Sequence, residues 1–186
     1  MFFFLGLFWS GPHLAFSAEL EIHHINVQQG DSTLIIGPDG TTILIDAGKS
    51  GKGINEVVPY LKSVGLIPSR GLTYMLATHR DSDHLGGLDE VINAGYDVFS
   101  NICDNGSKKT GTQISQFLKA ANKTKARVVT QIPLGQIIPL GDGAKATAVA
   151  VHGAVLGLGL VPGVTDENDF SVAILVQYKD FYYLTA

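Results

Sequence analysis

Four side chains that can bind a metal ion lie within six positions of the stretch ATHRDSDHLGG, residues 77–87. They are His79, Asp81, Asp83 and His84. Imidazole nitrogen and carboxylate oxygen both suit a borderline cation such as Zn²⁺ or Mn²⁺. Without a cation, two carboxylates and two imidazoles packed together would be left with repulsion or unfilled acceptors. The residue types favour a metal-binding loop. A polar turn that is merely rich in Asp is the alternative interpretation of the four residues taken alone.

The elements on either side of this loop would bring the four side chains together. GLTYMLATH, residues 71–79, has the pattern of a short buried strand, and HLGGLDEVINAG, residues 84–95, that of a helix. Side chains two apart at the end of a strand point to the same side, and the last two ligands lie where the helix begins. The adjacent glycines, 86 and 87, lack a Cβ atom and allow other backbone to approach closely.

The rest of the chain predicts a layered α/β domain of 186 residues. Two apolar runs joined by Pro38-Asp39-Gly40 are typical of an antiparallel hairpin. Apolar spacing predicts helices over residues 54–66 and 112–127. Further strands are expected over 20–27, 126–132, 145–153, 171–178 and 180–186, with a Gly-rich loop over 152–163.

The N-terminal segment has a different composition from the remainder. Residues 1–16 are mostly apolar but too few to cross a bilayer as a stable helix, and AFSA, residues 15–18, offers the small residues of a cleavage site. This predicts a signal peptide over residues 1–18 and a secreted or periplasmic protein. Because the segment carries no Lys or Arg, an uncleaved membrane anchor is the alternative.

Charge and cysteine content exclude some classes of protein. A net charge of −4 argues against a surface coated in basic residues for nucleic acid. Residues 108–127 nevertheless hold six Lys or Arg and no acidic residue, which fits either a solvated helix face or a local surface for an anion. Cys103 is the only cysteine, so an intrachain disulfide and a thiolate zinc cluster are both excluded, and a small buried apolar role is expected.

The stretch HRDSDHLGG resembles the His-x-His-x-Asp-His motif of the metallo-β-lactamase superfamily, with Asp81 at the position of the second His. That Asp variant looks like the competence-protein, or DNA-internalisation, branch. The likeness extends to residues 25–48 and 167–186. It implies an αββα sandwich, with residues 19–186 forming its N-terminal half plus part of the second sheet. The sequence stops before the Gly-Asp motif, so the domain is expected to be incomplete at its C-terminal end.

The same resemblance implies roles for individual residues. His79 and Asp81 match ligands of a first metal, and Asp83 and His84 match ligands of a second. Asp83 would also orient the attacking water and is the expected catalytic residue. Asp46, in LIDAG, matches a carboxylate that supports the metal loop by hydrogen bonding.

Two further ligand candidates lie near the C-terminal end. Asn168 stands where the superfamily usually has a His before its paired strands, and an amide oxygen is the weaker ligand. His152 is the other candidate, although it lies one strand earlier. Asp31, in the QGD stretch, matches a loop position for which the sequence provides no role.

The resemblance implies a metal-dependent hydrolase that acts on a phosphodiester or another ester through a metal-bound hydroxide. Two divalent cations are expected, Zn²⁺ first and Mn²⁺ as the alternative. The substrate would be a small molecule or a phosphodiester, with nucleic acid as a candidate partner. Two other functions remain open: a non-catalytic or incomplete module for binding or DNA uptake, and a membrane-tethered accessory of DNA uptake.

Overall fold

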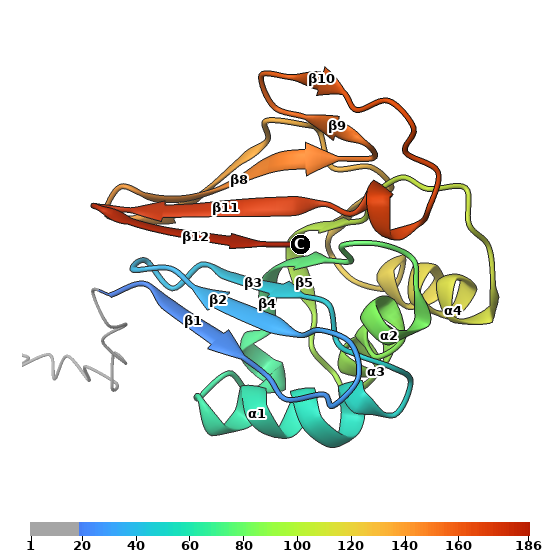
Figure 1. The fold of residues 1–186 in the computed structure, drawn as a ribbon. Coiled ribbons are helices and arrows are strands. Elements are labelled where there is room, and N and C mark those ends of the chain that lie inside the picture. The colour runs from blue at the N-terminus through green and yellow to red at the C-terminus, as the bar shows by residue number, and fades with distance from the viewer. Residues whose placement is uncertain (1–18) are drawn as a thin grey trace, which may run out of the picture.

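Two six-stranded β-sheets lie face to face in the computed structural model, which describes residues 19–186 (Figure 1). Helices cover the outer face of the first sheet, so the described chain has the order helices, sheet, sheet. This agrees with the predicted layered α/β architecture. The signal peptide predicted over residues 1–18 lies outside the described residues. Within residues 19–186, no helix is long and apolar enough to cross a membrane.

The first sheet has its strands in chain order, antiparallel from β1 to β3 and parallel from β3 to β6. The predicted hairpin joins β2 to β3, and the Gly40 N–H donates to the Gly37 carbonyl at 2.8 Å to close its turn. The strands are β1 Glu21–His24, β2 Thr33–Ile36, β3 Thr42–Ile45, β4 Leu72–Leu76, β5 Val98–Cys103 and β6 Arg127–Val129.

The helices pack their apolar faces on the first sheet. Leu61, Leu88 and Phe117, each from a different helix, are fully buried in one cluster with the β2 and β3 side chains. Pro59 lies in the first turn of α1, directly after a π-helical turn, and the N-terminal turn is the place where a helix tolerates proline best. The helices are α1 Val58–Ser63, α2 Ser82–Leu85, α3 Leu88–Asn93 and α4 Thr112–Ala121, with a π-helical turn Gly53–Val57 and 3₁₀ turns Pro68–Arg70 and Asn168–Phe170.

The second sheet is antiparallel throughout and encloses a second core against the first sheet. Ile35 and Ile43 from the first sheet share this core with Ile174 and Val176 from the second. Its strands are β7 Ile137–Gly141, β8 Ala144–Val151, β9 Ala154–Val155, β10 Gly159–Leu160, β11 Ala173–Tyr178 and β12 Phe181–Thr185.

The structure differs from the sequence-based expectation in three places. β5 and β7 were not predicted, because their apolar residues neither alternate cleanly nor form a continuous run: Phe99 and Ile137 are half exposed. The stretch 152–163, expected to be a loop, forms the short β9–β10 hairpin. Gly157 and Gly159 both have φ of 82°, a conformation that suits glycine and lets the chain reverse within a few residues.

Candidate metal centre

The predicted metal loop lies at the edge of the first sheet where the parallel strands β3, β4 and β5 end. Asp46 directly follows β3, Thr78 and His79 follow β4, and Asp104 follows β5. Side chains just beyond the carboxyl ends of neighbouring parallel strands converge, which is why this edge of an α/β sheet usually carries the binding site. The topology therefore brings together residues that are up to 58 positions apart in sequence.

Asp46 anchors the loop from behind. Its side chain is fully buried, and Oδ1 accepts a hydrogen bond from the Thr78 N–H at 2.8 Å. Oδ2 accepts from the Thr78 hydroxyl at 2.6 Å and from Nδ1 of His84 at 2.8 Å. These contacts show the supporting carboxylate that the LIDAG stretch predicted. Asp46 also has a φ of 56°, a left-handed conformation that Asp tolerates better than most residues.

These hydrogen bonds determine which ring nitrogens are protonated. A carboxylate only accepts, so Nδ1 of His84 carries a proton. The Thr78 hydroxyl donates to Asp46 and therefore accepts from Nδ1 of His79, 3.0 Å away. Both imidazoles thus have their Nδ1–H groups engaged and their Nε2 atoms available. The two rings lie with centroids 3.9 Å apart. Orientation of a ligand imidazole through its other nitrogen is typical of metal-binding histidines.

Nε2 of His79 is the atom that most clearly lacks a partner. It is buried, and no hydrogen-bond partner reaches it from the described residues. Burial, and then the neighbouring His84, lower the pKa of His79, so the ring is neutral and its Nε2 lone pair is available. Burial would also lower the pKa of His84, but the hydrogen bond that His84 donates to Asp46 and the charges of Asp46, Asp83 and Asp31 raise this pKa. A cation would therefore have to displace a proton from His84 in mildly acidic solution.

The two carboxylates of the motif have other partners. Lys109 donates to Oδ1 of Asp81, and Gln29 donates to Oδ2 of Asp83 at 3.3 Å. Across residues 19–186, no group of three or more His, Cys, Asp or Glu side chains is placed so as to hold a metal ion. The chemistry of the donors still fits a borderline divalent cation, because two oriented imidazoles, one with an orphaned nitrogen, lie beside two carboxylates. The ligand set remains a prediction.

The QQGD stretch packs directly against the metal loop. Gly30 has a φ of 97°, and a Cβ atom placed on it would lie 1.7 Å from the carbonyl oxygen of Asp83. Only glycine allows this approach, which brings Gln29 to the Asp83 carboxylate. The sequence suggested no role for Asp31. Its backbone carbonyl accepts a hydrogen bond from the Gly48 N–H at 3.0 Å. The stretch therefore supports the loop largely through its backbone.

The two other ligand candidates lie in separate connections of the second sheet, His152 between β8 and β9 and Asn168 in the 3₁₀ turn before β11. Asn168 uses its side-chain amide to donate to Oδ1 of Asp166 at 2.7 Å. His152 stacks on Phe170, with ring centroids 4.5 Å apart and 19° between the planes. Neither residue makes a hydrogen bond to His79, Asp81, Asp83 or His84 within the part of the chain that the structure describes.

Sequence reasoning missed two residues that hold the loop in place. Arg80, an unspecified position of the motif, pairs with the buried carboxylate of Asp104 through Nη2 at 2.8 Å. Glu167 accepts from the Arg80 N–H at 2.9 Å and from Nδ2 of Asn105 at 3.0 Å. Burial would raise the pKa of Glu167, but these hydrogen bonds together lower it. An Arg and a Glu that are 87 positions apart give no local signal of such a contact.

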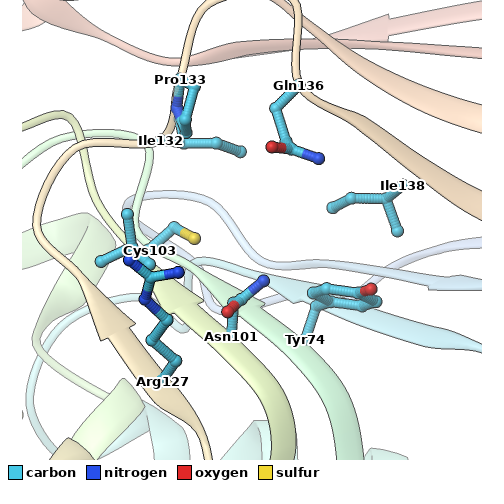
Figure 2. Close-up of a pocket in the computed structure, with 9 residues that line it drawn as sticks. Tyr74, Asn101, Cys103, Arg127, Ile132, Pro133, Gln136 and Ile138 are labelled. Carbon is cyan, nitrogen blue, oxygen red and sulfur yellow. The ribbon is translucent and has the colours of Figure 1, made fainter.

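A separate pocket opens between the two sheets, and Figure 2 shows the side chains around it. Asn101 and Arg127 come from the first sheet, whereas Ile138 comes from the second. Cys103 contributes its sulfur, and burial followed by the charge of Asp104 raises the pKa of this thiol to about 12. The thiol is therefore not a nucleophile at neutral pH, in agreement with the expected buried apolar role.

Comparisons with known proteins agree with this arrangement. Residues 25–99 match the family model of the metallo-β-lactamase superfamily. A 78-residue stretch is 33% identical to Recombination protein 2 of Haemophilus influenzae, covering 40% of this chain and 9% of that protein. A 63-residue stretch is 33% identical to the Beta-lactamase-like protein 2 homolog of Caenorhabditis elegans, covering 34% and 21%. The chain thus spans less than a quarter of the length of these two relatives.

Solved structures share the fold over most of the chain. A motif mutant of the metallo-β-lactamase from Cronobacter sakazakii superposes with a TM-score of 0.58 at 16% identity, covering 89% of this chain and 60% of that one. The same enzyme with its HARLDQ motif gives a TM-score of 0.53 at 16% identity, covering 83% and 54%. At this identity the likeness shows the fold alone. Together with the family match over residues 25–99, this likeness supports a metallo-β-lactamase superfamily domain; members of that superfamily are generally metal-dependent hydrolases.

Proposed function

We propose that the chain provides the metal loop of a metal-dependent hydrolase that cleaves a phosphodiester or a related ester. The observation that carries the proposal is the orphaned Nε2 of His79, buried beside the ring of His84, with both Nδ1 atoms held from behind. A buried polar atom without a partner costs free energy unless something binds it. A divalent cation is the ligand that the superfamily fold makes most natural.

Each residue of the metal loop would have a separate role in binding the metal or orienting the water. His79 and Asp81 would hold one cation, and His84 and Asp83 a second, with each imidazole binding through Nε2. When bound, such a cation lowers the pKa of a coordinated water and polarises the scissile bond. Asp83 would orient that water. The side-chain amide of Gln29 donates to the Asp83 carboxylate and so helps to fix its position. Asp46 would keep His84 in the tautomer that offers Nε2.

The phosphodiester is preferred over other esters for two reasons. The loop at residues 107–109 brings two lysines beside the metal loop, and one of them contacts Asp81. The partial match to Recombination protein 2 is consistent with the competence-protein branch and with nucleic acid as a substrate. Zn²⁺ is the first choice of cation and Mn²⁺ the second. We extend the proposal to export of the protein through residues 1–18.

A second candidate function is a non-catalytic binding module of the same fold. The contact between Lys109 and Asp81 favours it, because the ammonium group supplies the positive charge that a cation would otherwise bring to this carboxylate. The two candidates differ in whether the loop binds a cation when Lys109 is present. Metal content and turnover therefore separate them.

The experiment is to compare hydrolysis by the wild-type chain and Asp83→Asn, using a chromogenic phosphodiester, a lactone and a β-lactam, with and without chelator. Asn keeps the shape of Asp83 but cannot act as a base, so turnover should fall by at least about 100-fold, in the range typical of general-base loss. Asp142→Asn, on the distant β7–β8 turn, is the matched control and should retain full activity. Chelator-sensitive turnover that survives in Asp83→Asn would contradict the assigned role.

A further inference from the structure

The two lysines that favour a phosphodiester belong to a pocket beside the metal loop, to which the proposed function assigns no ligand. It lies between the loop after β5 and the segment that connects β10 to β11. Its lining consists of Ser107, Lys108, Lys109, His152, Glu167 and Phe170. Two of these residues also contact the metal loop: Lys109 binds Asp81, and Glu167 accepts from the Arg80 N–H. A ligand in this pocket would therefore lie next to the groups proposed to perform the chemistry.

Some of the charged side chains of this pocket have hydrogen-bond or ion-pair partners, and one does not. Glu167 accepts hydrogen bonds from the Arg80 N–H and from Asn105, so its negative charge already has donors. Lys109 is occupied by Asp81. Lys108, by contrast, is exposed and has no ion-pair partner anywhere in residues 19–186. The pocket thus presents one uncompensated cation to a ligand, with a second ammonium group beside it.

His152 adds a hydrogen-bond donor to the same wall. The backbone N–H of His152 donates to the Phe170 carbonyl at 3.2 Å, and the His152 ring stacks on the Phe170 ring, so backbone and side chain both pack against Phe170. Nδ1 is buried without a partner in the described chain. The ring lines the pocket, and an imidazole N–H is the group through which it would donate to a bound anion. His152 therefore offers a donor toward the pocket.

From these contacts we infer that the pocket is an anion subsite that holds a phosphate group of the substrate through Lys108 and His152, next to the metal loop. The inference rests on the proposed function for its position in catalysis, because it names the group that the hydrolase would recognise. Lys109 would join the subsite when a cation draws Asp81 away from it. Anion and metal binding should then strengthen one another, as two ligands that favour the same arrangement must.

The test uses inorganic phosphate as the probe, titrated into chelator-treated protein and followed by calorimetry and by NMR of the His152 ring. The wild-type chain should bind phosphate saturably, and Lys108→Gln should weaken binding at least about five-fold. Lys123→Gln removes the same charge from another exposed position of the 108–127 segment and should leave binding unchanged. His152→Phe keeps a ring to stack on Phe170 but loses the donor, and it should also weaken binding.

The outcomes distinguish this inference from the proposed function. Phosphate binding that depends on Lys108, in a protein without chelator-sensitive turnover, would support the subsite and contradict the hydrolase. Turnover of a phosphodiester with the same KM in wild type and Lys108→Gln would contradict the subsite and leave the hydrolase standing. The subsite is also wrong if no saturable phosphate binding occurs, or if Lys108→Gln and Lys123→Gln weaken it equally. If both proposals hold, Lys108→Gln raises KM for the phosphodiester and leaves kcat unchanged.

Discussion

At the scale of single residues, Asp46 acts on the candidate metal centre through His84 and Thr78. It accepts three hydrogen bonds while fully buried, and two of them come from the strand end that carries His79. The imidazole orientation on which the site depends is therefore determined by a residue 33 positions upstream of His79. A carboxylate in this position supports both the shape of the loop and the tautomer of its ligand.

Asp46→Asn should weaken metal binding by about 10- to 100-fold, because an amide holds the His84 Nδ1–H less strongly than a carboxylate. Asn also tolerates the left-handed backbone of this position, so the variant should fold. Affinity is measured by competition with a fluorescent chelator. Asp142→Asn, another Asp with positive φ at 47°, is the matched control. Unchanged affinity in Asp46→Asn would mean that the carboxylate has no role in orienting the ligand.

At the scale of elements, Arg80 fastens the end of β4 to the end of β5 and to the segment before β11. Its guanidinium contacts Asp104 through Nε at 3.2 Å and Nη2 at 2.8 Å, and Nη1 donates to the Lys109 carbonyl at 3.1 Å. Both partners of this ion pair are nearly buried. Burial nevertheless raises the pKa of Asp104 despite the opposing effect of Arg80, so the carboxylate depends on its hydrogen bonds.

Arg80→Met should lower the free energy of unfolding by about 3–5 kcal/mol, because it leaves the Asp104 carboxylate buried without its cation. Urea unfolding at pH 7, followed by circular dichroism, provides the measurement. Arg127→Met, at an exposed position of β6, should change stability by no more than about 0.5 kcal/mol. A loss below about 1 kcal/mol in Arg80→Met would show that water reaches Asp104 and replaces the arginine.

Sequence reasoning succeeded for elements with local signals. The hairpin at Pro38–Gly40, the strand before the metal loop and the paired β11 and β12 all have strong apolar patterns or turn residues. It failed for β5, because the polar Ser100 and Asn101 interrupt the apolar pattern of the strand. It also failed for β9 and β10, because their glycines are typical of a loop. In the site, the motif supplied the four ligand candidates, and their role as ligands stays a prediction. Long-range contacts such as Arg80 with Glu167 leave no pattern in one sequence.

At the scale of the whole molecule, helices cover only one of the two outer sheet faces within the described residues. α1, α3 and α4 cover the first sheet, whereas no helix of residues 19–186 covers the outer face of the second sheet (Figure 1). Large apolar side chains are exposed on the second sheet, among them Leu158 at 82% and Leu160 at 79%. The candidate metal centre lies at the edge where the two sheets meet, since Ser171 lies 3.3 Å from Nδ1 of His79. The segment that leads into β11 of the second sheet therefore contributes to the site.

The central claim, that residues 79–84 hold a divalent cation, is tested most directly by calorimetric titration of Zn²⁺ and Mn²⁺ into chelator-stripped protein. Wild type should bind at least one cation per chain, more tightly at pH 8 than at pH 6, because the raised pKa of His84 means that protonation competes with metal at the lower pH. His79→Ala should weaken binding at least about ten-fold by removing one ligand. His24→Ala, which removes an imidazole from β1, should leave it unchanged. The account is contradicted if wild type binds no cation at either pH, or if His79→Ala binds as tightly as wild type.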